Sequence, residues 1–135
     1  MFVLNLVTPE KRIATEVEVE EVVIPGERGQ LTILPGHAPL ITTLSVGRVQ
    51  YRAKGNSEVQ SAIVSWGYCE VNPNGVNVLA ETAESIEEVD KARADTALRR
   101  AQKRLTEPNL DPDQMVKYQR KVRRALARLG KDVSH

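Results

Sequence analysis

The feature of this sequence that most constrains its fold is a change of residue pattern near Thr82. Before that point, short runs of Val, Ile, Leu and Thr are separated by Gly, Pro and Asn, which is typical of strands joined by tight turns. The turn residues recur about every 8–12 residues, a spacing that favours a sandwich or barrel. After that point the chain is rich in Ala, Arg and Leu, and its pattern favours helices. We therefore predict an antiparallel β-sandwich over residues 1–84 and an antiparallel α-helical hairpin over residues 85–135.

The clearest predicted β-hairpin joins residues 69–71 to residues 76–79 through the turn Asn72-Pro73-Asn74-Gly75. Earlier strands are expected at residues 2–7, 17–24, 31–34, 40–44 and 49–53. Because aromatic residues make up only 4% of the chain, Val, Leu, Ile and Ala must fill the core. The single cysteine, Cys69, lies in a predicted strand, and we expect it to be a small buried side chain.

Two helices are predicted after the sandwich. Residues 85–88, Ser-Ile-Glu-Glu, match a capping box and are expected to begin a helix that ends at Leu105. Asp111 is the expected N-cap of the second helix, with Pro112 in its first turn and Gly130 directly after its end. The short loop between the helices predicts that they pack antiparallel.

The apolar stripes on these helices are narrow. The stripe on the second helix consists of Met115, Tyr118, Val122, Ala125 and Leu129. The stripe on the first helix is mostly Ala, so the seam between them buries little apolar area. At about 25 cal/mol per Å² such a seam offsets only part of the ordering entropy. We therefore predict that the hairpin is a mobile element.

Several kinds of chemistry are excluded by the residues themselves. Residues 25–30 contain two glycines but are not followed by the Lys-Ser/Thr of a phosphate-binding loop. One cysteine and two widely separated histidines, His37 and His135, do not have the spacing of a zinc site. A net charge of +1 provides no general attraction for nucleic acid or lipid. We therefore expect a protein that is not an enzyme by itself. No segment reaches the roughly 20 apolar residues of a membrane span, and a cytoplasmic start is the simplest expectation.

Residues 22–40 are similar to the signature of the epsilon subunits of bacterial F-type ATP synthases. The run Leu34-Pro35-Gly36-His37-Ala38-Pro39-Leu40 is the most specific part of this resemblance. The segment Asp90-Lys91-Ala92-Arg93-Ala94 resembles the family's Asp-x-x-Arg-Ala element on the first C-terminal helix. The resemblance runs in order along essentially the whole chain, and it implies a ten-strand-type sandwich followed by a helical hairpin.

The resemblance also implies a role. Family members are non-catalytic subunits of the central stalk, peripheral to the cytoplasmic side of the inner membrane, and bound to the gamma subunit and the ring of c subunits. They help couple proton flow and rotation to ATP synthesis, and their C-terminal helices can block ATP hydrolysis. Carried over by position, His37 lies near the gamma contact. The residues expected to face the c ring are Pro25, Gly26, Glu27, Arg28, Gly29 and Gln30. This chain departs from the family pattern at Gln30, which is acidic in some relatives, and at Trp66, where glycine is common.

Some family members bind ATP on the hairpin, so the resemblance implies ATP, with or without Mg²⁺, as a regulatory ligand and no required cofactor. The matching positions are Glu84, Asp90, Arg93, Arg100, Arg124 and Arg128. Arg93 and Arg100 are seven residues apart on one helical face, so rows of arginines from two antiparallel helices could converge on a triphosphate. The alternative is that Asp90 and Arg93 form an exposed pair that contributes little, with the other arginines solvated.

The second helix is strongly basic. In the family the expected partners include the alpha/beta catalytic subunits, and this helix is expected to meet an acidic segment of the catalytic beta subunits when the helices extend. The residues predicted to contact that segment are Arg120, Lys121, Arg123 and Arg124. Two alternatives from other classes are a β-sandwich adaptor with a nucleic-acid-binding tail and an enzyme acting on a nucleotide. The near-neutral charge of the whole chain and the lack of stacking aromatic residues on the helices argue against the first. The second lacks a metal site or a general base. We therefore expect no nucleic-acid partner.

Overall fold

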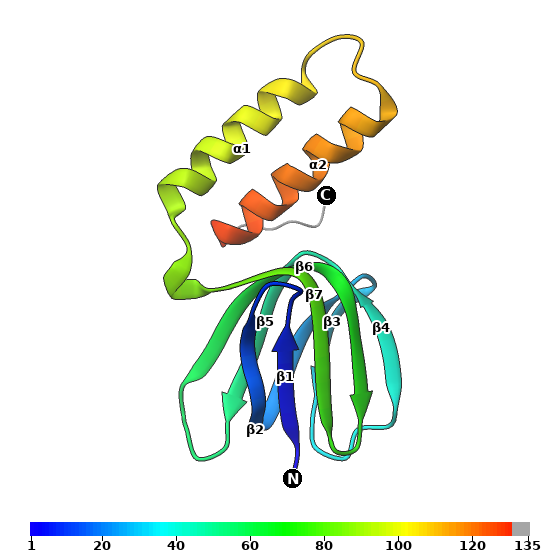
Figure 1. The fold of residues 1–135 in the computed structure, drawn as a ribbon, viewed down its shortest axis with the longest axis vertical. Coiled ribbons are helices and arrows are strands. Elements are labelled where there is room, and N and C mark those ends of the chain that lie inside the picture. The colour runs from blue at the N-terminus through cyan, green and yellow to red at the C-terminus, as the bar shows by residue number, and fades with distance from the viewer. Residues whose placement is uncertain (131–135) are drawn as a thin grey trace. The chain divides into compact units, whose positions relative to one another are not determined.

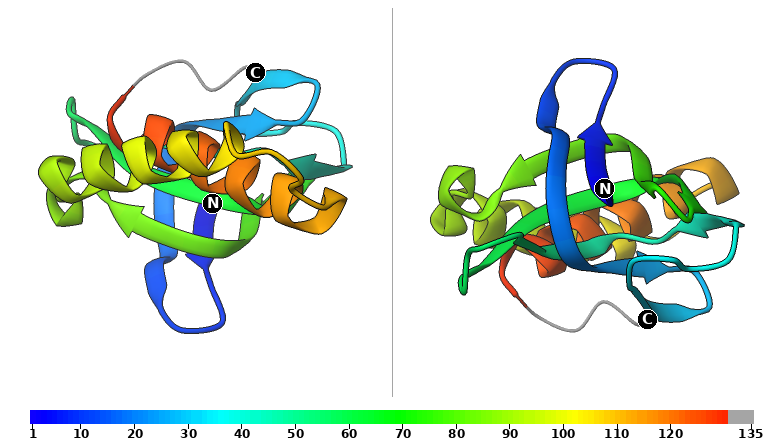
Figure 2. Two further views of the ribbon diagram at one scale, coloured as in Figure 1. Left: turned by 90° about the horizontal axis from the view of Figure 1, so that it is seen from above. Right: turned by 90° about the horizontal axis from the view of Figure 1, so that it is seen from below.

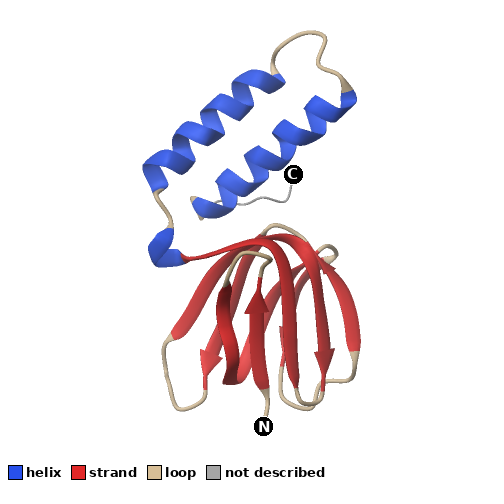
Figure 3. Ribbon diagram, viewed as in Figure 1, coloured by secondary structure: helices blue, strands red, loops and turns tan. Residues whose placement is uncertain are grey.

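The computed structural model describes residues 1–130, which form two compact units. The first unit spans Met1–Ile86 and consists of strands, and the second begins at Glu87 and consists of helices (Figures 1 and 3). The predicted fold class, an antiparallel β-sandwich followed by an α-helical hairpin, is confirmed. The predicted end of the hairpin domain at His135 lies outside the described residues, as does that histidine itself.

Seven strands build the first unit. They are β1 (Val3–Val7), β2 (Arg12–Gly26), β3 (Gly29–Ile33), β4 (Leu40–Leu44), β5 (Gly47–Ala53), β6 (Val59–Asn72) and β7 (Gly75–Ser85). The strand order is β1-β7-β6-β4-β2-β3, and β5 pairs with both β2 and β6. Strand β1 pairs in parallel with β7 and antiparallel with β2, so the sheet closes on itself.

The sheet has seven strands where the family resemblance implied a ten-strand type. The difference arises because the long strands change neighbours partway along. Strand β6 pairs with β5 up to Val64 and with β4 from Gly67 onward. Between these halves, Trp66 and Gly67 have positive φ values of 42° and 131°, which bend the strand. A long strand that bends in this way pairs with one neighbour before the bend and with another after it, as two shorter strands would.

Strand β2 also bends, at a β-bulge. Leu4 pairs with Val17 but Leu6 pairs with Ala14, so β2 carries one extra residue there. Within this segment Glu16 has a φ of 48°, and its N–H donates to Asn5 Oδ1 over 2.8 Å. The side chain of Asn5 therefore holds the bulge in place.

The core of the first unit is aliphatic, as the low aromatic content predicted. Its largest fully buried side chains are Leu4, Leu6, Val22, Ile24, Ile33, Leu44, Val46, Val49, Val64, Val71, Val76 and Val78. Cys69 is buried with them, and this burial, reinforced by the nearby Glu70 charge, raises the pKa of its thiol to about 12. The predicted turn between β6 and β7 is confirmed, because Asn72 pairs with Gly75 across it.

A short 3-10 helix, η1 (Ile86–Glu88), spans the boundary between the units in the chain, and the second unit contains two helices, α1 (Lys91–Leu105) and α2 (Pro112–Arg128). The predicted capping box at Ser85 is wrong. Ser85 is the last residue of β7 and pairs with Ala62, so strand pairing takes the residue that local sequence assigns to a cap. Asp90 is the N-cap of α1 instead, and its carboxylate accepts the Arg93 N–H over 3.0 Å.

Helix α2 begins and ends as predicted. The Asp111 carboxylate accepts the Gln114 N–H over 2.8 Å, Pro112 is in the first turn, and Gly130 after the helix has a φ of 74°. The two helices lie side by side (Figure 1), and seen from above one overlaps the other (Figure 2). The buried residues on them are Ala94, Leu98, Ala101, Ala125 and Ala127. Met115, expected in the apolar stripe, is 44% exposed, so the stripe covers less of α2 than the sequence predicted.

Candidate functional site

Three surfaces of the described residues are candidate sites: a polar turn, an apolar strand face and a cationic groove. The first is the turn between β2 and β3. Gly26 pairs with Gly29, which leaves Glu27 and Arg28 as an exposed two-residue tip. A Cβ on Gly26 would lie 2.8 Å from the carbonyl oxygen of Gly29, so the close approach of the two strands requires glycine there. The Glu27 N–H donates to the carbonyl oxygen of Thr43, which anchors this polar tip to β4.

The second surface is the outer face of β4, β6 and β7, which we call the apolar face and define by Ile41, Tyr68 and Leu79. These side chains are exposed by 73%, 48% and 38%. Tyr68 pairs directly with Leu79, and Ile41 is two residues from the β4 partner of Tyr68. Single exposed apolar residues are ordinary, but three that neighbour one another across three strands make this face a candidate interaction surface. The alternation of strand residues could have revealed Tyr68 and Leu79, since each adjoins a buried residue that faces the core.

The predicted gamma-contact residue, His37, lies in the loop between β3 and β4, just before this face. The backbone N–H of His37 donates to the carbonyl oxygen of Leu34 over 3.1 Å, and the ring Nδ1 of His37 lies 2.6 Å from the carbonyl oxygen of Ala38. These contacts, with the positive φ of Gly36, make the loop a defined turn. Leu34 is 53% exposed on the same loop, which extends the apolar character of this end of the unit.

The third surface is a groove between α1 and α2, which we call the hairpin groove. It has a volume of about 230 Å³ and is lined by Ala97, Arg100, Ala101, Tyr118, Lys121, Arg124, Ala125 and Arg128. Four of these side chains are cationic and, among the lining residues, none is acidic. Small alanines form the hollow, and positive charges surround it. This arrangement can bind an anion through charge-assisted hydrogen bonds.

The structure brings together half of the residues predicted to bind a nucleotide. Arg100, Arg124 and Arg128 line the hairpin groove. Arg93 does not line it, but its spacing from Ala97 and Arg100 places it one turn away on the same face of α1.

Two of the residues predicted to bind a nucleotide do not line the groove. Asp90 is the N-cap of α1, where its carboxylate accepts the Arg93 N–H. Glu84 belongs to β7 in the first unit.

The four cations of α2 predicted to contact an acidic partner do not all line the same surface. Lys121 and Arg124 line the hairpin groove, whereas Arg120 and Arg123 are not among its lining residues. Sequence reasoning missed Tyr118, which it treated only as part of the apolar stripe. Three cationic groups lie over the ring of Tyr118, with Arg104 Cζ at 5.1 Å, Lys117 Nζ at 5.6 Å and Lys121 Nζ at 5.5 Å from its centroid.

Within residues 1–130 no group of three or more His, Cys, Asp or Glu side chains is arranged to hold a metal ion. The described helices include none that is long and apolar enough to cross a membrane.

Each of the two units matches a domain of a known protein family. The beta-sandwich domain of the ATP synthase delta/epsilon chain matches residues 1–86, and the long alpha-helix domain of the same chain matches residues 87–130. The ATP synthase epsilon chain of Bdellovibrio bacteriovorus is 42% identical over 126 residues, which is 93% of this chain and 90% of the relative. That of Koribacter versatilis is 48% identical over 104 residues, which is 77% of this chain and 71% of the relative.

Solved structures share the fold. A chain of the Euglena gracilis mitochondrial ATP synthase, in a structure of OSCP/F1/c-ring in rotational state 1, matches with a TM-score of 0.80 and 22% identity, covering 96% of this chain and 79% of that one. A chain of the Tetrahymena thermophila mitochondrial ATP synthase central stalk/c-ring matches with a TM-score of 0.61 and 19% identity, covering 95% and 92%.

Proposed function

This chain belongs to the ATP synthase delta/epsilon chain family, and we propose that it is a central-stalk subunit of a proton-translocating ATP synthase. In this role it couples rotation to ATP synthesis and restrains ATP hydrolysis through its C-terminal helices, without catalysing a reaction itself. It is peripheral to the inner membrane, on the cytoplasmic side, and is held there by the other subunits.

The observation that carries the docking role is the apolar face. A partner that covers Ile41, Tyr68 and Leu79 would gain about 25 cal/mol for each Å² of their apolar surface that it removes from water, most of it at Ile41, the most exposed of the three. We assign this face, together with the neighbouring His37 loop, to the gamma subunit. The exposed row lies on paired strands of a closed sheet, so it offers the partner a surface that needs no rearrangement on binding.

Assembly with the gamma subunit tests this assignment. Ile41→Asp, at an exposed position, should leave the fold intact and abolish co-purification of the chain with gamma. Val59→Asp is the matched control, because Val59 is 57% exposed on the same strand system but lies outside the apolar face. Equal retention of gamma by both variants would contradict the assignment.

The turn at residues 25–30 is the proposed contact with the c ring. Its tip, Glu27 and Arg28, is polar, exposed and anchored to β4, so it can meet the polar loops of another subunit without ordering first. Replacing both tip residues by Ser should weaken capture of the purified c ring while leaving gamma binding unchanged. Loss of both interactions together would argue against a separate c-ring contact.

The hairpin is the proposed regulatory element. Its groove of alanines and cations supports binding of ATP, which would favour the closed helix pair, and the basic residues of α2 would meet an acidic segment of the alpha/beta subunits when the helices separate. Calorimetric titration of the whole chain with MgATP tests this role. Saturable binding that is lost in Arg100→Ala and Arg124→Ala would support it, and unaltered binding in both variants would contradict it.

A further inference from the structure

We propose that the carboxylate of Glu70 makes the apolar face selective for a protein partner that presents an arginine, whose guanidinium pairs with Glu70 and stacks on the ring of Tyr68. The inference rests on the proposed docking of the gamma subunit to this face, and it names the chemistry that the partner must bring. It adds one charged residue to a surface otherwise defined by Ile41, Tyr68 and Leu79.

Glu70 lies among the residues of the apolar face. It is exposed, it follows Tyr68 by two residues on β6, and it pairs with Ile41 on β4. On its other side Glu70 pairs with Asn77 on β7, while Tyr68 pairs with Leu79. Directly paired residues of antiparallel strands point to the same side of a sheet, and so do residues two apart on one strand. The carboxylate is therefore on the same side of the sheet as all three apolar side chains.

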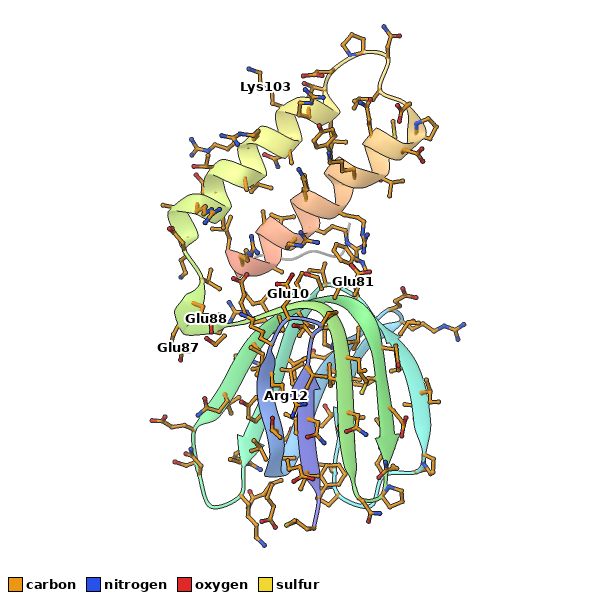
Figure 4. All side chains as sticks on the ribbon, viewed as in Figure 1. Glu10, Arg12, Glu81, Glu87, Glu88 and Lys103 are labelled. Carbon is orange, nitrogen blue, oxygen red and sulfur yellow. The ribbon has the colours of Figure 1, made fainter. Side chains whose placement is uncertain are left out.

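The charge of Glu70 has no counter-ion in the described part of the chain. Within residues 1–130 the Glu70 side chain forms no ion pair and no hydrogen bond. The row of paired residues that contains Tyr68 continues across β7 and through Val7 on β1, and it reaches a cation at Arg12 on β2 (Figure 4). Arg12 is three strands away from β6, which is roughly 14 Å along the sheet and too far for an ion pair.

An unpaired carboxylate among apolar side chains restricts what can cover them. A partner that covers Ile41 and Tyr68 also removes water from Glu70, their neighbour on the sheet. A charge that loses its water without gaining a counter-ion opposes association, whereas a charge that is paired across the interface strengthens it and fixes its orientation. The face therefore fits a partner with a cation opposite Glu70 and rejects one without it.

Arginine suits this arrangement better than lysine. Two residues along a strand span about 7 Å, so the ring of Tyr68 and the carboxylate of Glu70 are both within reach of one guanidinium. A guanidinium can stack on an aromatic ring and can donate two parallel hydrogen bonds to a carboxylate, whereas an ammonium group is a more strongly hydrated point charge.

Two other occupants fit the face less well. A second copy of this chain packed face to face would bring another Glu70 toward the first and no cation, since the remaining residues of the face are Ile41, Tyr68 and Leu79. An anionic lipid surface would be repelled by the carboxylate. The charge thus favours a protein partner of complementary sign.

The experiment measures the equilibrium affinity of the whole chain for an alpha/beta/gamma assembly prepared without it, at low and at high salt. Glu70→Gln keeps the size of the side chain and removes its charge, so it should weaken binding about tenfold or more and reduce the salt dependence. Glu58→Gln is the matched control, because Glu58 is exposed directly before β6, where Val59 pairs with Arg52 on β5. It should change the affinity less than about twofold.

A double-mutant cycle tests whether one arginine meets both residues. Tyr68→Leu keeps an apolar side chain but removes the ring, and it should weaken binding about threefold. If one guanidinium contacts both Tyr68 and Glu70, the double variant should lose less affinity than the product of the two single losses. Losses that multiply would overturn the shared arginine. Circular dichroism of each variant without partner separates these effects from any change of fold.

The sign of the Glu70→Gln effect decides the inference. Tighter binding would mean that the partner buries the carboxylate without pairing it, and unchanged binding would mean that the carboxylate stays in water; either result overturns the requirement for a cation. Loss of binding in Ile41→Asp would then leave the docking role standing. If Ile41→Asp also binds normally, both the inference and the assignment of the face fail. Dimerisation of the chain alone that Ile41→Asp abolishes would identify a second copy as the occupant instead.

Discussion

The two units of this chain are stabilised in different ways. The first unit closes its sheet around large aliphatic side chains such as Leu4 and Ile24, which are fully buried. The second pairs two helices over a seam that is mostly Ala and places four cations beside it. Because burial of apolar area supplies most folding free energy, we expect the first unit to be stable by itself and the second to be marginal. The proposed docking face therefore lies on the unit with the large aliphatic core, and the proposed regulatory element is the unit with the Ala-rich seam.

The largest expected effect is in the bend of β6. A Cβ on Gly67 would lie 2.0 Å from the carbonyl oxygen of Leu79, and the φ of 131° is one that side chains disfavour. Gly67→Ala should therefore lower the free energy of unfolding of the first unit by about 4 kcal/mol or more. Urea denaturation followed by Trp66 fluorescence measures this, with Gly55→Ala as the control, since its Cβ would meet nothing within 4 Å. Equal losses in both variants would point to positive φ alone.

Truncation of one leucine in each unit sharpens the comparison. Leu4→Ala should lower the free energy of unfolding of the sandwich by about 3 kcal/mol, because it empties a fully enclosed site. Leu98→Ala should reduce helicity at 222 nm and leave the sandwich transition unchanged, because it removes the largest buried side chain of the seam. A shift of the sandwich transition by Leu98→Ala would break the distinction between the two units.

A smaller effect comes from the buried thiol of the first unit. The pKa of Cys69 is raised to about 12 in the folded chain, so the folded state keeps its proton while the unfolded state loses it near the ordinary value of about 8.5. Stability from this group is therefore complete below that value and declines as the pH rises toward 12. Between pH 8 and 10 the wild type should lose about 1–2 kcal/mol more than Cys69→Ala does. Parallel pH dependence of the two would contradict a protonated buried thiol.

The smallest expected effect concerns the start of α1. Asp90→Ala removes the cap of the Arg93 N–H and should destabilise the hairpin by about 1 kcal/mol, seen as lost helicity, while Asp90→Asn keeps the cap. If Asp90 acts only as the cap, ATP affinity should follow helicity in both variants. A loss of ATP binding in Asp90→Asn with helicity retained would instead make its charge part of the nucleotide site.

Local patterns predicted much of the fold because they depend on neighbours in sequence. The turn at residues 72–75, the cap at Asp111 and the stop at Gly130 each follow from a few adjacent residues. Prediction failed where contacts with residues far apart in the sequence override the local pattern. Ser85 has the sequence of a cap, but pairing with Ala62 extends β7 through it. Met115 has the spacing of a seam residue, but the seam does not extend far enough along α2 to cover it.

By itself, the sequence determined that a sandwich rich in Val, Ile and Leu precedes a helical hairpin with a basic second helix, because periodicity and composition are properties of neighbouring residues. Only the tertiary structure decided which residues meet. It joined Ile41, Tyr68 and Leu79 from three strands, and it placed Arg100 opposite the cations of α2 around one groove. Strand pairing and helix packing bring together residues far apart in the chain, and no local pattern encodes which ones they are.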